Sequence, residues 1–163
     1  MRGSFEEVNT AGSIQRRGCL VIGYGNTLRG DDGVGVRVAE AVEGWKLPGM
    51  EVIACHQLMP ELAEAVARAA KVVFVDAAVD APRDVQWRRL APASSSQLMA
   101  HAADPRTLLA MARDVYHQSP EAWWLTIPIE IIEFAESLSP FAQEGYTKAL
   151  EQVRTWAKGA VAG

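Results

Sequence analysis

The loop that joins an apolar strand to a helix near the start of the chain restricts the fold more than any other feature. Cys19–Ile22 is a short apolar run of the kind found in a fully buried strand. The segment Gly23–Gly33 follows it, rich in glycine and carrying the adjacent acids Asp31 and Asp32. From Val34 onward, apolar residues recur at helical spacing. The segment is therefore the first unit of a strand–loop–helix pattern, which indicates an α/β fold.

The rest of the chain continues this alternation. Three further apolar runs predict strands at Met50–Cys55, Val72–Asp76 and Trp123–Ile129. Helices are expected to begin at Pro60, at Asp104 or Pro105, and after Ser139–Pro140. The apolar positions predicted to face the core are Leu62, Ala63, Val66 and Ala70 in the first of these helices, Leu108, Leu109, Ala112 and Val115 in the second, and Tyr146, Leu150, Val153 and Ala157 in the third.

A fourth strand is predicted at Val85–Leu90, close behind the strand that ends at Asp76. Because a parallel crossover usually needs a dozen or more residues, the short connection predicts that this strand runs antiparallel. The expected fold is a three-layer αβα sandwich around a five-stranded, mostly parallel, twisted sheet with the fourth strand antiparallel. We expect residues 1–17 to be a polar N-terminal tail and residues 18–163 to form a single domain.

Composition narrows the classes of function. The 163 residues are 49% hydrophobic and 22% charged with a net charge of −4, which is ordinary for a globular domain. No basic stripe predicts nucleic-acid binding, and no apolar run approaches the roughly 20 residues of a membrane helix. The expectation is a cytoplasmic monomer without nucleic-acid or membrane partners. Cys19 and Cys55 lie in separate strand-like runs, which predicts two buried free thiols.

The first loop does not match a nucleotide-binding loop. The dinucleotide fingerprint would need a third glycine where the chain has Leu28. Asp31 and Asp32 also precede the helix that follows, where two carboxylates would repel a pyrophosphate. The simplest alternative is that one of these acids only caps the helix. A cap would explain one acid but not both.

Acidic side chains from two strands are predicted to meet at one edge of the sheet. The first strand leads into the loop with Asp31 and Asp32, and the third ends at Asp76. His101 lies eleven residues after Leu90, a span of about 35 Å when extended, so it can return to this edge. It could equally be a surface histidine before a helix. Two carboxylates and an imidazole suit a divalent first-row metal without distinguishing nickel from zinc or manganese.

Several short motifs, in order along the chain, resemble those of the hydrogenase maturation endopeptidases. The opening motif is Gly23-Tyr24-Gly25-Asn26-Thr27-Leu28 followed by Asp31-Asp32-Gly33-Val34-Gly35. The later pieces are Pro60-Glu61-Leu62, Phe74-Val75-Asp76-Ala77, Leu98-Met99-Ala100-His101, Ile127-Pro128-Ile129-Glu130 and Leu138-Ser139-Pro140. The resemblance covers roughly Cys19 to Val153.

This resemblance implies a trio of nickel-contacting residues, which falls on Asp32, Asp76 and His101. Family members often carry Glu at the position of Asp32, and Ser-Pro commonly precedes the histidine, where this chain has Met99-Ala100. His56, just after the second strand, is the competing imidazole.

The implied reaction is hydrolysis of one peptide bond near the C-terminus of a nickel-iron hydrogenase large-subunit precursor, after nickel insertion. The precursor would be the partner and would supply the nickel, with other divalent metals able to substitute in vitro. Asp32 or Asp31 would activate water as a general base, or the nickel would polarise the carbonyl or a bound water. The alternative is a nickel-binding or chaperone protein without catalysis.

Overall fold

The structure is a computed structural model that describes residues 18–79, 82–94, 104–130 and 133–162. The predicted polar tail, residues 1–17, lies outside the described residues, as does His101.

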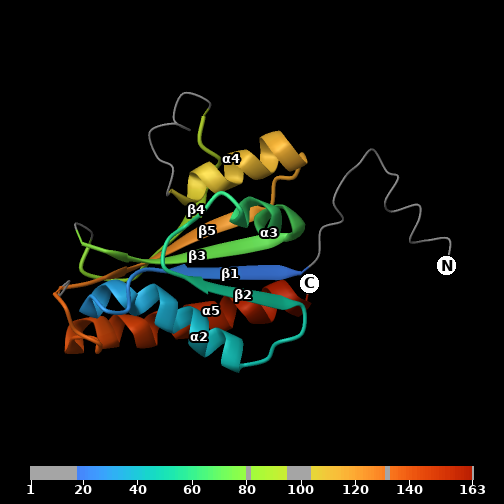
Figure 1. The fold of residues 1–163 in the computed structure, drawn as a ribbon. Coiled ribbons are helices and arrows are strands. Elements are labelled where there is room, and N and C mark those ends of the chain that lie inside the picture. The colour runs from blue at the N-terminus through green and yellow to red at the C-terminus, as the bar shows by residue number, and fades with distance from the viewer. Residues whose placement is uncertain (1–17, 80–81, 95–103, 131–132, 163) are drawn as a thin grey trace.

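A five-stranded mixed sheet forms the middle of the fold (Figure 1). Its strands are β1 (Cys19–Tyr24), β2 (Met50–Cys55), β3 (Lys71–Ala78), β4 (Gln86–Leu90) and β5 (Glu121–Pro128). In space the order is β2-β1-β3-β5-β4, and the first four of these strands are parallel. β4 pairs antiparallel with β5, from Gln86 opposite Thr126 to Leu90 opposite Ala122. The predicted antiparallel fourth strand is confirmed.

Helices cover both faces of the sheet, as the sequence predicted (Figure 1). The helical elements are the 3-10 turn η1 (Gly30–Gly33) and the helices α2 (Val34–Gly44), α3 (Leu62–Arg68), α4 (Pro105–Tyr116) and α5 (Pro140–Ala162). α3 and α4 pack on one face, and α2 and α5 pack on the other. In the part of the chain that the structure describes, none of the helices has the length and apolarity needed to cross a membrane.

Burial of β1 on both faces explains why its sequence is apolar throughout. Alternate side chains of a strand point to opposite faces, so Leu20 and Ile22 pack toward α3 and α4 while Val21 packs toward α2 and α5. β3 repeats this arrangement, with Phe74 on the first face and Val75 on the second. The central strands therefore lie between two apolar cores, one on each face of the sheet.

Two glycines let α2 approach the sheet more closely than a side chain would allow. A Cβ atom on Gly35 would lie 2.4 Å from the Val75 carbonyl oxygen and 2.8 Å from that of Tyr24. A Cβ atom on Gly23 would lie 2.1 Å from the Gly35 carbonyl oxygen. The start of α2 therefore rests directly on the backbones of β1 and β3, which fixes the loop between β1 and α2.

The structure differs from the sequence prediction at several element ends. β3 continues beyond Asp76 to Ala78 because Ala77 and Ala78 pair with Ile127 and Pro128 of β5. β5 begins two residues earlier than predicted, at Glu121. α3 begins at Leu62, so Pro60 lies in the turn before it.

One predicted core residue of α4 faces solvent instead. Val115 is 60% exposed, whereas Leu108 and Ala112 are buried and Tyr116 packs against the same core. The buried face of α4 follows positions 108, 112 and 116, which are four residues apart. Position 115 does not belong to this row, so its side chain faces solvent.

The chain reverses its direction of winding between β1 and β3. α2 carries the chain from β1 outward to β2 across one face, and α3 carries it back past β1 to β3 across the other. In open α/β sheets, ligands bind at the carboxyl ends of the strands that flank such a switch point. Here those strand ends lead to Asp32 and Asp76.

Candidate functional site

The loop between β1 and α2 is tied to its surroundings mainly through backbone contacts. The Gly25 amide donates to the carbonyl oxygens of Cys55 and His56, at 3.2 and 3.1 Å. Gly25 has φ +143°, and a Cβ atom there would lie 2.1 Å from the Asp32 carbonyl oxygen. Only glycine fits this position without strain. The loop is therefore held against the end of β2 with its acids at the switch point.

Asp31 is fully buried and holds distant segments together. Its carboxylate accepts hydrogen bonds from the Ser139 amide and the Ser139 hydroxyl, each at 2.7 Å, and from the Glu130 amide at 3.1 Å. The Ser139 hydroxyl in turn accepts a hydrogen bond from the Ala142 amide at 3.1 Å, which caps the start of α5. Asp31 thus links the first loop to the end of β5 and to α5.

The alternative that Asp31 or Asp32 caps the following helix is wrong. Gly33 occupies the N-cap position of α2, and no side chain caps that helix. The two acids sit in the preceding turn η1, where their side chains diverge to different partners. The hydrogen bonds that Asp31 accepts from Ser139 and Glu130 are typical of a structural carboxylate, and its catalytic role stays a prediction. Of the two acids, Asp32 is therefore the candidate residue of the functional site.

Asp32 is part-buried, and a backbone contact fixes its carboxylate. Its Oδ2 accepts a hydrogen bond from the Asn26 amide at 2.9 Å. The Asn26 side chain accepts from the Leu28 amide at 2.9 Å, which tightens the same loop. One oxygen of Asp32 is thereby held, and the other accepts no hydrogen bond from the residues that the structure describes.

Asp76 reaches the site from β3, and its environment disfavours a negative charge. The pKa of this carboxyl is raised to about 7, mainly by burial and to a smaller extent by the negative charge of Asp32. The Tyr24 hydroxyl and the Ala77 amide oppose that shift. No ion pair to Asp76 occurs among the described residues. Asp32 of η1 and Asp76 of β3 are therefore close enough for the charge of Asp32 to act on Asp76.

Two buried polar groups lie near each other on the face covered by α3 and α4, and one of them, the Tyr24 hydroxyl, lies beside Asp76. The Tyr24 hydroxyl and the Trp124 indole nitrogen are both buried, and neither has a well-formed hydrogen bond within the described segments. Burial is the largest cause that raises the pKa of Tyr24, and the negative charge of Asp76 is the second largest. Tyr24 is thus close enough to Asp76 for each to shift the pKa of the other.

The imidazole of the predicted site cannot be placed from the described residues. His101 lies outside them, so its assignment stays a prediction. The competing His56 is exposed and directly follows the edge strand β2, one strand further from Asp76 than the loop with Asp32. Across the described residues, no three His, Cys, Asp or Glu side chains are grouped to hold a metal ion. The ligand role of Asp32 and Asp76 therefore stays a prediction, as does that of His101.

Sequence reasoning missed Tyr24 and Ser139 as partners of the acids. Tyr24 follows Ile22 at the strand spacing of two, which places it on the same face as Asp76 once β1 and β3 are known to be neighbours. That adjacency is a property of the sheet order and has no local sequence signal. Ser139 was expected only to precede α5.

The two cysteines are free, as predicted. Cys19 is buried and Cys55 is half-buried, and burial raises the pKa of both thiols. Neither thiol provides the easily ionised sulfur that a metal ligand or nucleophile needs.

Comparison with known proteins identifies the architecture. No protein-family model matches the chain, and no curated protein matches it. Solved structures do match. The hydrogenase maturating endopeptidase HybD from Escherichia coli aligns with a TM-score of 0.69 and 23% identity, covering 87% of this chain and 93% of that one. The fold is that of the hydrogenase maturation proteases.

Two archaeal structures extend this similarity. The [NiFe] hydrogenase maturation protease HycI from Thermococcus kodakarensis aligns with a TM-score of 0.69 and 19% identity, covering 94% of this chain and 97% of that one. The hydrogenase 2 maturation peptidase from a Thaumarchaeota archaeon aligns with a TM-score of 0.64 and 21% identity, covering 84% and 96%. The chain therefore spans nearly the whole length of these proteases, and the fold that the sequence motifs implied is confirmed.

Proposed function

We propose that this protein is an endopeptidase that removes the C-terminal extension of a nickel-iron hydrogenase large-subunit precursor after nickel has been inserted. The observation that carries the proposal is the convergence of Asp32 and Asp76 at the switch point of a maturation-protease fold. Fold alone does not determine function, so the acids at this edge are the more specific support.

The chemistry of the acid pair favours a cation as its partner. Asp76 is partly buried near a second carboxylate and has no ion pair within the described residues. A bound divalent ion would relieve that repulsion and supply the missing positive charge. We propose that the ion is the nickel carried by the precursor, contacted by Asp32, Asp76 and His101. Nickel then belongs to the substrate and signals that the precursor is ready for cleavage.

Hydrolysis requires a water molecule activated next to the scissile carbonyl. Asp32 can accept the proton from water as a general base, because only one of its oxygens is bonded to the loop backbone. Alternatively, the substrate's nickel lowers the pKa of a bound water or polarises the carbonyl. In both routes Asp31 acts as a structural support that fixes η1, and thereby the position of Asp32.

The proposal is tested by incubating the full-length protein with purified precursor in nickel-loaded and nickel-free forms. Mass spectrometry of the large subunit then reports loss of the C-terminal extension. We expect cleavage of the nickel-loaded form only. Stable binding to that form without any cleavage would instead support a nickel-binding or chaperone protein. Equal cleavage of both forms would overturn recognition through nickel.

A further inference from the structure

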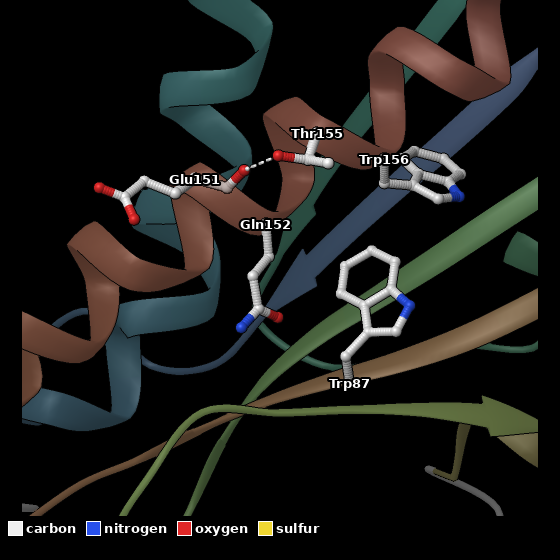
Figure 2. Close-up of a pocket in the computed structure, with 5 residues that line it drawn as sticks. All are labelled: Trp87, Glu151, Gln152, Thr155 and Trp156. Carbon is white, nitrogen blue, oxygen red and sulfur yellow. Dashed lines mark hydrogen bonds between the residues drawn. The ribbon is translucent and has the colours of Figure 1, made fainter.

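A cavity of about 630 Å³ opens between β4 and α5, on the face of the sheet opposite Asp76. Trp87 of β4 and Trp156 of α5 form its aromatic walls (Figure 2). Glu151, Gln152 and Thr155 line it from α5. Nothing in the proposed hydrolysis uses these residues, so the cavity calls for a separate explanation.

The aromatic part of the cavity belongs to a cluster of three indoles. The ring centroids of Trp87 and Trp156 are 6.2 Å apart, and Trp123 lies 6.3 Å from the first and 5.9 Å from the second. All three side chains are only partly buried. The cluster already accommodates one guanidinium, because the Arg89 side chain lies over the Trp123 ring at 5.2 Å. The indole faces of Trp87 and Trp156 have no such cation within the described residues.

The polar groups along α5 offer hydrogen-bond acceptors to the cavity. The Gln152 amide oxygen has no hydrogen-bond partner within the described part of the chain, and because it is buried, a ligand reaches it only when the side chain turns toward the cavity. Figure 2 shows this oxygen on the side of Trp87 and the amide nitrogen turned away. The Thr155 hydroxyl donates its proton to the Glu151 carbonyl at 3.1 Å, which leaves only its lone pairs for a ligand. The Glu151 carboxylate is exposed and makes no ion pair among the described residues.

These groups select for a planar cation that donates several hydrogen bonds. Indole faces attract cations, and a guanidinium stacks on them better than a compact ammonium does. The unpaired Gln152 oxygen and the Thr155 lone pairs match a group that donates several hydrogen bonds. The Glu151 carboxylate lines the cavity but points away from the two indoles in Figure 2, so it contributes negative charge at the rim. We propose that the cavity binds an arginine side chain presented by a partner protein.

The neighbouring strand explains why a polypeptide should carry that arginine. β4 is the last strand of the sheet, and within the described residues it pairs only with β5. An extended segment can add to such a free edge through backbone hydrogen bonds while one side chain enters the adjacent pocket. The occupant is therefore an extended, arginine-bearing segment. This inference holds whether or not the acid site hydrolyses peptides.

The test is a titration of the ¹⁵N-labelled full-length protein with the peptide acetyl-Gly-Arg-Gly-amide, followed through the indole N–H signals. Signals are assigned with Trp87→Phe and Trp156→Phe variants. We expect the Trp87 and Trp156 signals to shift in a saturable way. The signal of Trp45, whose ring is already covered by Arg154 at 4.0 Å, should stay in place. The matched peptide with citrulline for arginine, which is neutral and nearly the same shape, should shift neither signal.

Two conservative substitutions distinguish arginine binding in the pocket from a nonspecific effect of the protein's net charge. Gln152→Leu and Glu151→Gln should each weaken arginine-peptide binding several-fold and together about tenfold, with the thermal midpoint unchanged. Glu43→Gln removes the same charge from an exposed residue of α2 and should leave binding as in the wild type. Equal shifts with the citrulline peptide, no shift with either peptide, or unaltered binding by the double variant would each overturn the arginine site.

Discussion

The Asp31 carboxylate accepts two hydrogen bonds from Ser139, 108 positions later in the chain, each at 2.7 Å. This contact joins the turn that carries Asp32 to the start of α5. A buried carboxylate with three donors is stabilising only while all its partners are present. The contact between Asp31 and Ser139 therefore explains why the first loop carries two adjacent acids. Asp31 holds the turn in place, and Asp32 faces the candidate site.

Replacing Asp31 should destabilise the fold strongly. We expect Asp31→Ala to lower the free energy of unfolding by about 3 kcal/mol, because three donors lose a charged acceptor. Ser139→Ala should cost about 1–2 kcal/mol, and the double variant less than the sum, since the residues share hydrogen bonds. Urea unfolding of the four proteins measures this coupling. Additive losses would show that the contact contributes nothing.

The close approach of α2 to the sheet predicts a position-specific glycine effect. Gly35→Ala should lower the free energy of unfolding by about 2–3 kcal/mol, because its Cβ atom would meet the backbone of β1 and β3. Gly44→Ala, in the same helix, adds a methyl group where no atom lies within 4 Å. It should be neutral or stabilise by about 0.5 kcal/mol. Equal effects of the two substitutions in thermal unfolding would contradict this packing.

The sequence predicted the elements whose signals are local. β1 and β2 are continuous apolar or strand-like runs, Asp104 and Pro105 mark the start of α4, and the short connection before β4 fixed its direction. Each of these depends on a few neighbouring residues, where periodicity and turn chemistry are direct evidence.

What the sequence did not predict depends on contacts between distant segments. The final residues of β3 are strand because β5 pairs with them, and Tyr24 lies beside Asp76 because β1 and β3 are neighbours. Asp31 was read as a possible helix cap because its true partner follows 108 positions later. The acid pair at the switch point could be expected from strand alternation, whereas its buried surroundings could not.

Asp76 should reduce stability at neutral and alkaline pH. Its pKa is about 7 in the folded chain, raised from 3.8 by burial. The folded state thus holds a proton that the unfolded state releases at lower pH, so stability falls as pH rises between these values. Asp76→Asn should stabilise the protein by about 1–2 kcal/mol at pH 8, and this gain should vanish by about pH 4.

Urea unfolding in chelator-treated buffer measures this pH dependence. Asp114→Asn is the control, because Arg113 lowers the pKa of that exposed carboxyl, so the substitution should give no gain at pH 8. A loss of stability in Asp76→Asn at pH 8 would mean that the carboxyl is kept for folding and not for binding.

The three histidines of the chain should differ in their effect on cleavage. If His101 contacts the nickel of the precursor, His101→Ala should slow cleavage by about 100-fold or more. The His56→Ala variant should cleave the precursor at a rate within about twofold of the wild-type rate, because His56 is exposed beside the edge strand. His117, which ends α4 with φ +57°, serves as a further control. The reverse pattern, with His56 essential and His101 dispensable, would transfer the imidazole role to His56.

The most direct test of the acid pair is the rate at which its variants cleave nickel-loaded precursor. Asp32→Asn and Asp76→Asn keep the shape of each side chain while removing its charge, and Glu43→Gln removes a charge from an exposed position of α2. We predict that both aspartate variants stay folded and lose about 100-fold or more in cleavage rate, while Glu43→Gln matches the wild type. Wild-type rates in both aspartate variants would contradict recognition of the nickel-bearing precursor by Asp32 and Asp76.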